Sequence, residues 1–153
     1  HGLLYHHGEA RKRDPYRTGL TAVQVASLHR DDVLEALRTR RCYATSGVKI
    51  LLDVTVNGAP MGSELVTDDA LDVHVVVHGE GPLARIEVVS DRGVIACEET
   101  DARAHETRFS VRGRYVYVRV TQADGEMAWS SPVFIDAAAS KPISAASASN
   151  THA

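Results

Sequence analysis

The most constraining feature of this sequence is a change of hydrophobic period at Gly47. Before it, Val33, Leu34 and Leu37 recur at helical spacing, and we predict a helix from about Arg30 to Arg40. After it, apolar and polar residues alternate, which is typical of half-buried β-strands. The chain therefore divides into a short N-terminal part with a helix and a longer part built of strands.

The strand-rich part extends from residue 48 to residue 136. It contains about seven short segments of alternating pattern, separated by turn signals such as Asn57-Gly58. This spacing predicts an antiparallel β-sandwich that is immunoglobulin-like in architecture only, because the Cys-Trp-Cys pattern of antibody domains is missing. Pro132 indicates that the last segment lies at a sheet edge or carries a bulge.

The flanking regions have a different character. Residues 20–26 are apolar nearly throughout, as in a strand covered on both sides within a parallel α/β sheet. Together with the helix they suggest the end of an α/β unit in residues 1–47. Eleven of the last seventeen residues are Ala or Ser, so we predict that residues 137–153 are a disordered tail.

Charge is distributed unevenly along the chain. Residues 1–47 hold eight Lys or Arg and five Asp or Glu, whereas residues 48–136 hold eight and fifteen. An acidic β-region argues against nucleic acid as a partner, because binding to phosphates needs a basic face. The sequence contains no apolar run of about 20 residues, so we predict no membrane span.

Histidines and aromatic residues are the candidate functional groups. His1, His6 and His7 are possible metal ligands, or simply part of an exposed polar loop. His74 and His78 lie about 13 Å apart if they stand on one strand, too far to chelate a single ion. Trp129, with Tyr115 and Tyr117, forms either a sugar-binding platform or half-buried packing. These aromatic residues support a second possible function, a β-sandwich module that binds sugars or protein partners.

Several ordered strings resemble a known family. They are Gly19 to Val23, Asp32 to Gly47, Ile50 to Asp53, Val56 to Gly62 and Tyr117 to Pro132. They resemble the C-terminal end of large bacterial proteins of the PHP (polymerase and histidinol phosphatase) type, which are metal-dependent phosphoesterase-like proteins. The resemblance covers about residues 19–135.

The resemblance implies a fold and a function. In that family a distorted (β/α) barrel carries His, Asp and Glu ligands for divalent metals such as zinc, manganese or iron, which activate water for phosphoester hydrolysis. Residues 1–47 would then be the last strand–helix unit of the barrel in an α+β fragment, followed by the β-sandwich. By the same resemblance His1 would be a metal ligand, with His6 and His7 as alternatives.

The same resemblance extends to substrate and partner. Arg41 and Tyr43 would line the mouth of the parent barrel and contact substrate, or else Tyr43 packs between the helix and the sandwich. Most of the barrel is absent from this sequence. We therefore expect the chain by itself to bind no metal stably and to be inactive, with the N-terminal barrel of the parent protein as its partner.

Overall fold

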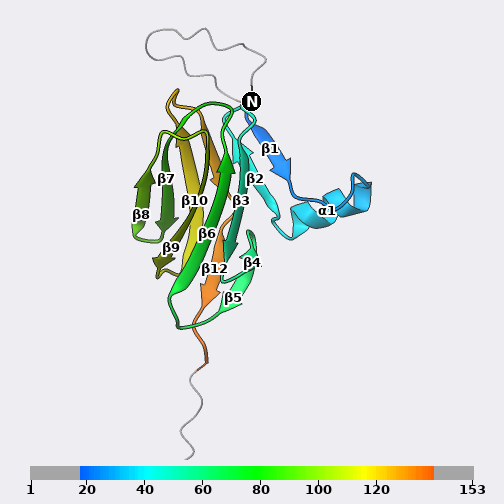
Figure 1. Ribbon diagram of the computed structural model, residues 1–153. Helices are drawn as coiled ribbons and strands as arrows, with labels where there is room; N and C mark the ends of the chain where they lie inside the picture. Colours follow the sequence, from blue (N-terminus) through cyan, green and yellow to red (C-terminus); the bar gives the residue numbers. More distant parts are fainter. Residues whose placement is uncertain (1–17, 140–153) are drawn as a thin grey trace, which may run out of the picture.

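The computed structural model describes residues 18–139, and strands make up most of this range (Figure 1). A single helix in this range, α1, spans Arg30–Arg38 and lies between the first two strands. The strands are β1 (Leu20–Val23), β2 (Cys42–Thr45), β3 (Leu51–Val56), β4 (Ala59–Pro60), β5 (Glu64–Val66), β6 (Leu71–His78), β7 (Leu83–Ser90), β8 (Gly93–Glu99), β9 (Ala104–Val111), β10 (Tyr115–Gln122), β11 (Met127–Ser130) and β12 (Val133–Asp136).

The strands form two sheets. The larger sheet has the order β1-β2-β11-β10-β12-β5, and β7 and β8 extend it from the other edge of β10. The smaller sheet has the order β4-β3-β6-β9. The pairs are antiparallel apart from β12 with β5, so the predicted antiparallel β-sandwich is confirmed at the level of its two sheets.

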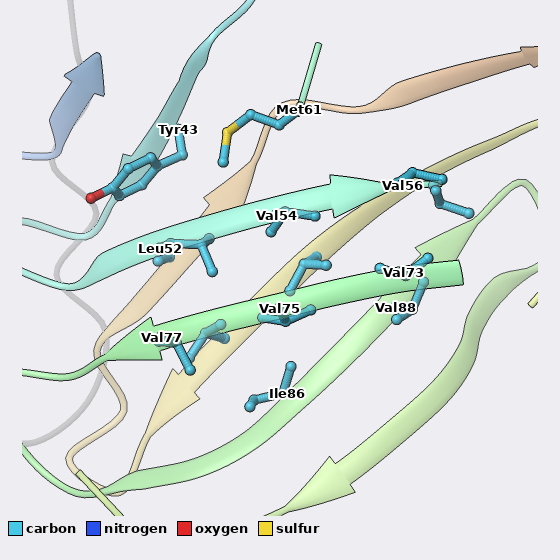
Figure 2. Close-up of a cluster of buried hydrophobic side chains, with 14 of the residues drawn as sticks. Tyr43, Leu52, Val54, Val56, Met61, Val73, Val75, Val77, Ile86 and Val88 are labelled. Carbon is cyan, nitrogen blue, oxygen red and sulfur yellow. The ribbon is translucent and has the colours of Figure 1, made fainter. Parts of the chain in front are cut away.

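The hydrophobic core lies between the two sheets. Valines at alternate positions of β6 and β10 are at most 1% exposed, while the residues between them face outward. Figure 2 shows the valines of β3 and β6 facing Ile86 and Val88 of β7. Removing each such side chain from water contributes roughly 1.5–3 kcal/mol before the cost of chain ordering. The period-2 pattern downstream of Gly47 therefore identified the core-facing positions correctly.

The N-terminal part of the described chain is joined to the larger sheet. Helix α1 ends at Arg38, close to the predicted end, and Arg40 then adopts a φ of 59° that turns the chain into β2. Strand β2, which we did not predict, lies between β1 and β11. The sheet thus continues upstream of the predicted boundary at residue 47.

Strand β1 differs from its sequence-based interpretation. We expected a strand covered on both sides in a parallel sheet, but β1 pairs antiparallel with β2 and lies at the edge of the described sheet. Its first two residues, Leu20 and Thr21, are exposed. An apolar run without alternation cannot distinguish an edge strand from a central one, because the pattern records composition and not pairing.

The connection between α1 and β2 rests on the turn between β4 and β5. Gly62 has a φ of 87° and is buried, and a Cβ atom added there would lie 2.5 Å from the carbonyl oxygens of both Thr39 and Arg40. Arg40 donates through Nε to the Gly62 carbonyl oxygen at 3.0 Å and pairs with Glu64 at 2.7 Å. These contacts fix the start of β2 to the rest of the sandwich.

Two further details follow from single residues. Pro132 was predicted to mark an edge or a bulge in the last strand, but it lies in a break that divides this segment into β11 and β12, and each of these has a strand on both sides. Since Pro has no N–H to donate, it ends the pairing of β11. At the margin where β8 and β9 meet, Glu98 accepts hydrogen bonds from the Thr107 hydroxyl and from His105, at 2.8 Å for the latter. Both bonds lower the pKa of Glu98, and the bond from Thr107 has the larger effect.

Candidate binding groove

Aromatic side chains gather on the outer face of the larger sheet. Because side chains alternate along β10, burying Val116 and Val118 places Tyr115 and Tyr117 outside. On β11 the same alternation buries Ala128 and Ser130 and turns Trp129 outward. All three aromatic residues are half-buried, which agrees with the packing alternative while leaving their rings accessible.

These rings line an open groove. Its cavity volume is about 360 Å³, and its walls are Tyr115, Tyr117, Trp129, Ser130, Pro132 and Phe134. Tyr115 and Phe134 are register partners whose ring centroids lie 6.4 Å apart at an interplanar angle of 55°, a tilted arrangement that aromatic pairs favour. We call these six residues the aromatic groove.

A cation lies over the ring of Phe134, one of the residues that line the aromatic groove. The Arg40 guanidinium carbon is 5.5 Å from the centroid of the Phe134 ring, within the range of a cation–π contact. Because Arg40 is also held by Gly62 and Glu64, its position over the ring is fixed by three contacts. The α1–β2 connection therefore contacts Phe134, one of the residues that line the groove.

A buried carboxylate lies on the same face as the groove. Glu87 is only 6% exposed, and Arg119, the register partner of Trp129, donates to it at 2.7 Å, while Arg85 lies 3.7 Å from it. The hydrogen bond from Arg119 lowers the pKa of Glu87. A buried carboxylate held ionised in this way needs its cation to offset the lost hydration.

The predicted substrate residues lie apart from this groove. Tyr43 is 7% exposed and packs in the core, where its hydroxyl donates to the Ile50 carbonyl oxygen at 2.9 Å, and burial raises its pKa (Figure 2). Arg41 is exposed, and its Nε donates to the Thr39 hydroxyl at 3.2 Å. Tyr43 therefore packs within the core of the sandwich, whereas the predicted packing was between the helix and the sandwich; its contact with substrate in a longer protein stays a prediction.

The candidate metal ligands are placed as follows. His1, His6 and His7 lie outside the described residues. Within residues 18–139 no group of three or more His, Cys, Asp or Glu side chains is close enough together to hold a metal ion. His74 and His78 share the outer face of β6, as predicted, and His74 pairs with Glu106 at 2.7 Å.

Within residues 18–139 no helix has the length and apolar character needed to cross a bilayer.

Sequence reasoning missed two parts of the groove. Phe134 and Pro132 were not grouped with Trp129, because β12 lies next to β10 only after the chain has turned at Pro132. Arg40 was missed for a similar reason, since its position depends on contacts more than 20 positions away. The alternation of Val133 and Ile135 around Phe134 was the available signal for an outward ring.

Comparison with known proteins gives relatives but no activity. No family model matches the sequence. A protein of Chlamydia trachomatis described as uncharacterized is 34% identical over 155 aligned positions, covering 87% of this chain and 25% of that protein. Relatives in Chlamydia muridarum and Chlamydia pneumoniae, also described as uncharacterized, are 34% and 33% identical over 79% of this chain and 23% of their own length. The chain thus spans about a quarter of the length of the curated relatives that it matches.

Proposed function

We propose that this chain is the C-terminal part of a larger PHP-type metal-dependent hydrolase, in which an upstream barrel carries out phosphoester hydrolysis. The observation that carries the proposal is the length of the relatives: the matched segment is about a quarter of each. The remaining three quarters leave room for a complete barrel domain. The strings from residue 19 to residue 135 supply the family resemblance.

In this proposal the described residues have a supporting role. The upstream barrel would hold the divalent metals, zinc, manganese or iron, that polarise the phosphate and activate water. The residues of the sandwich keep the α1–β2 connection in place through Gly62 and Arg40. His1, with His6 and His7 as alternatives, remains the proposed contribution of this chain to the metal ligands.

The test compares this chain with a longer protein that includes its upstream sequence. Both are assayed with p-nitrophenyl phosphate in the presence of manganese or zinc, and bound metal is measured by mass spectrometry. We expect turnover and bound metal in the longer protein alone. Robust turnover by this chain, or a folded longer protein that neither binds metal nor hydrolyses phosphoesters, would refute the proposal.

A second function is favoured by the aromatic groove. We propose that it binds a sugar ring, because carbohydrate rings expose C–H faces that stack on Tyr and Trp. Its volume of about 360 Å³ is at the low end of small-molecule sites, which suits one or two sugar units. Arg119, beside Trp129, carries donors for sugar hydroxyls.

Trp129 is the only tryptophan in the chain, so its fluorescence reports directly on the groove. Titration with neutral oligosaccharides is expected to shift or quench this emission, and Tyr117→Ala is expected to weaken binding about tenfold by loss of one stacking contact. His78→Ala, on the outer face of the other sheet, is the matched control and leaves binding unchanged. An emission spectrum that no oligosaccharide alters at millimolar concentration would argue against sugar binding.

A further inference from the structure

The described chain has an exposed apolar flank beside strand β1. Leu20 is 45% exposed and Leu51 on the outer face of β3 is 63% exposed, while Leu28, just before α1, and Leu37, within it, are 92% and 44% exposed. In Figure 1, α1 extends away from the two sheets on the side of β1. Leu51 shares the wall of one groove with Ala22 of β1, so the apolar surface beside β1 is continuous there, and apolar surface of this kind marks an interaction site.

The backbone of β1 is also unpaired on one side. The Gln24 N–H donates to the Arg41 carbonyl oxygen at 2.9 Å, so Gln24 directs its N–H toward the β2 side of the antiparallel ladder. By alternation, Ala22 directs its N–H and C=O toward β2, whereas Thr21 and Val23 direct theirs toward the open edge. Among residues 18–139 no strand pairs with that edge.

A groove continues from this edge. It has a cavity volume of about 380 Å³ between β1 and the smaller sheet, with apolar walls that include Ala22, Leu51 and Val76. Its polar groups are few, and Gln24 and Asp53 already bond to each other across it at 3.2 Å. Together, Leu20, Ala22, Leu51, Val76 and the open edge of β1 form what we call the β1 flank.

We propose that the β1 flank is the docking surface for the upstream domain of the longer protein, which adds a β-strand to the open edge of β1. This inference rests on the proposed function. The upstream polypeptide enters the described chain directly before β1, so an upstream strand is near the open edge in sequence order, and consecutive strands commonly pair. The curated relatives are about four times as long as the matched segment, which leaves room for such a domain.

Strand addition explains why an apolar segment lies at an exposed edge. Residues 20–26 have the composition of a strand covered on both sides, but in the described chain Leu20 and Thr21 are exposed. An added strand would bond to the outward N–H groups of Thr21 and Val23 and shield Leu20 and Leu51. An exposed edge of this kind otherwise favours aggregation.

Hydrogen exchange with single-residue resolution tests the proposal. In this chain the amides of Thr21 and Val23 should exchange rapidly, while Ala22 and Gln24, bonded to β2, are protected. In the longer protein Thr21 and Val23 should slow by about 100-fold or more, as expected for paired strand amides. Fast exchange of both amides in the longer protein, with Ala22 and Gln24 still protected, would overturn the proposal.

Two further arms separate the alternatives. Val23→Pro removes an outward N–H and should leave the thermal midpoint of this chain nearly unchanged, but in the longer protein it should restore fast exchange at Thr21. If Thr21 and Val23 become protected in this chain alone as its concentration rises, a second copy is the occupant and the proposal fails. If Thr21 and Val23 are protected in a longer protein that has no hydrolase activity, the docking surface is supported and only the PHP assignment is refuted. If the longer protein is active but these amides are not protected, the PHP assignment is supported and the docking surface is refuted.

Discussion

Replacing Gly62 by alanine tests whether the N-terminal strand–helix unit is fixed to the sandwich. The new Cβ would lie 2.5 Å from two carbonyl oxygens, those of Thr39 and Arg40, so the backbone must shift. We expect a loss of about 2–5 kcal/mol in the free energy of unfolding. Of this, roughly 1–2 kcal/mol comes from the left-handed φ and roughly 1–3 kcal/mol from the steric overlap.

Gly58→Ala is the matched control. Gly58 has a similar φ of 80°, but a Cβ atom there would meet nothing within 4 Å. The control should therefore lose only the conformational part, about 1–2 kcal/mol. The difference between the two variants measures the contact between the β4–β5 turn and the α1–β2 connection.

Urea unfolding followed by Trp129 fluorescence provides the measurement. Trp129 lies on β11, which pairs directly with β2, so its emission reports on the affected region. If Gly62→Ala and Gly58→Ala lose equal stability with equal m values, the overlap does not exist and the α1–β2 connection is not seated on the turn. That result would refute the reasoning for the whole N-terminal unit.

Three further predictions concern polar groups. The pKa of Glu98 in the folded state lies below its ordinary value of 4.5, so its ionised form stabilises the fold above that value. This contribution is lost as the pH falls through the folded-state pKa. In urea unfolding between pH 7 and pH 3, the free energy of unfolding of Glu98→Gln should therefore fall less steeply with falling pH than that of the wild type. Tyr43→Phe leaves the Ile50 carbonyl oxygen without its donor and should lower the free energy of unfolding by about 1–2 kcal/mol in thermal unfolding. An unchanged free energy of unfolding would show that water replaces the hydroxyl as the donor. Arg119→Met removes the main partner of buried Glu87 and should cost roughly 1–3 kcal/mol at pH 7, less than for an isolated buried pair because Arg85 remains; no difference from wild type would show that Arg85 alone suffices.

The sandwich was predictable because its core is encoded locally. In β6 and β10 the valines recur at every second position, and both strands bury that face. Helix α1 was equally predictable from the sequence, because Asp31 and Asp32 in its first turn and Arg38 in its last turn suit the helix dipole and its apolar residues recur at helical spacing. Such signals need no information from distant parts of the chain.

Strand β2 and the complete groove were not predictable in this way. Residues 42–45 are too few to show a period, and their pairing with β11 depends on residues far along the chain. The groove needs Phe134 beside Tyr115, a pairing that only the sheet order creates, and Arg40 reaches the Phe134 ring only because Gly62 and Glu64 hold it there. Arg41, a predicted substrate residue, is not among the residues that line the groove, and the predicted ligands His1, His6 and His7 lie outside the described residues.

The position of β2 has a consequence for synthesis on the ribosome. Cys42 and Ser131, which share a hydrogen bond, lie 89 positions apart. At about 5–20 residues per second, β2 waits roughly 4–18 s for β11 to be translated. During that time β2 has β1 as its only partner in the larger sheet as described, and its other edge is unpaired. This domain therefore depends on late closure, and a translational pause before β11 would extend the period in which a chaperone or an upstream domain can cover that edge.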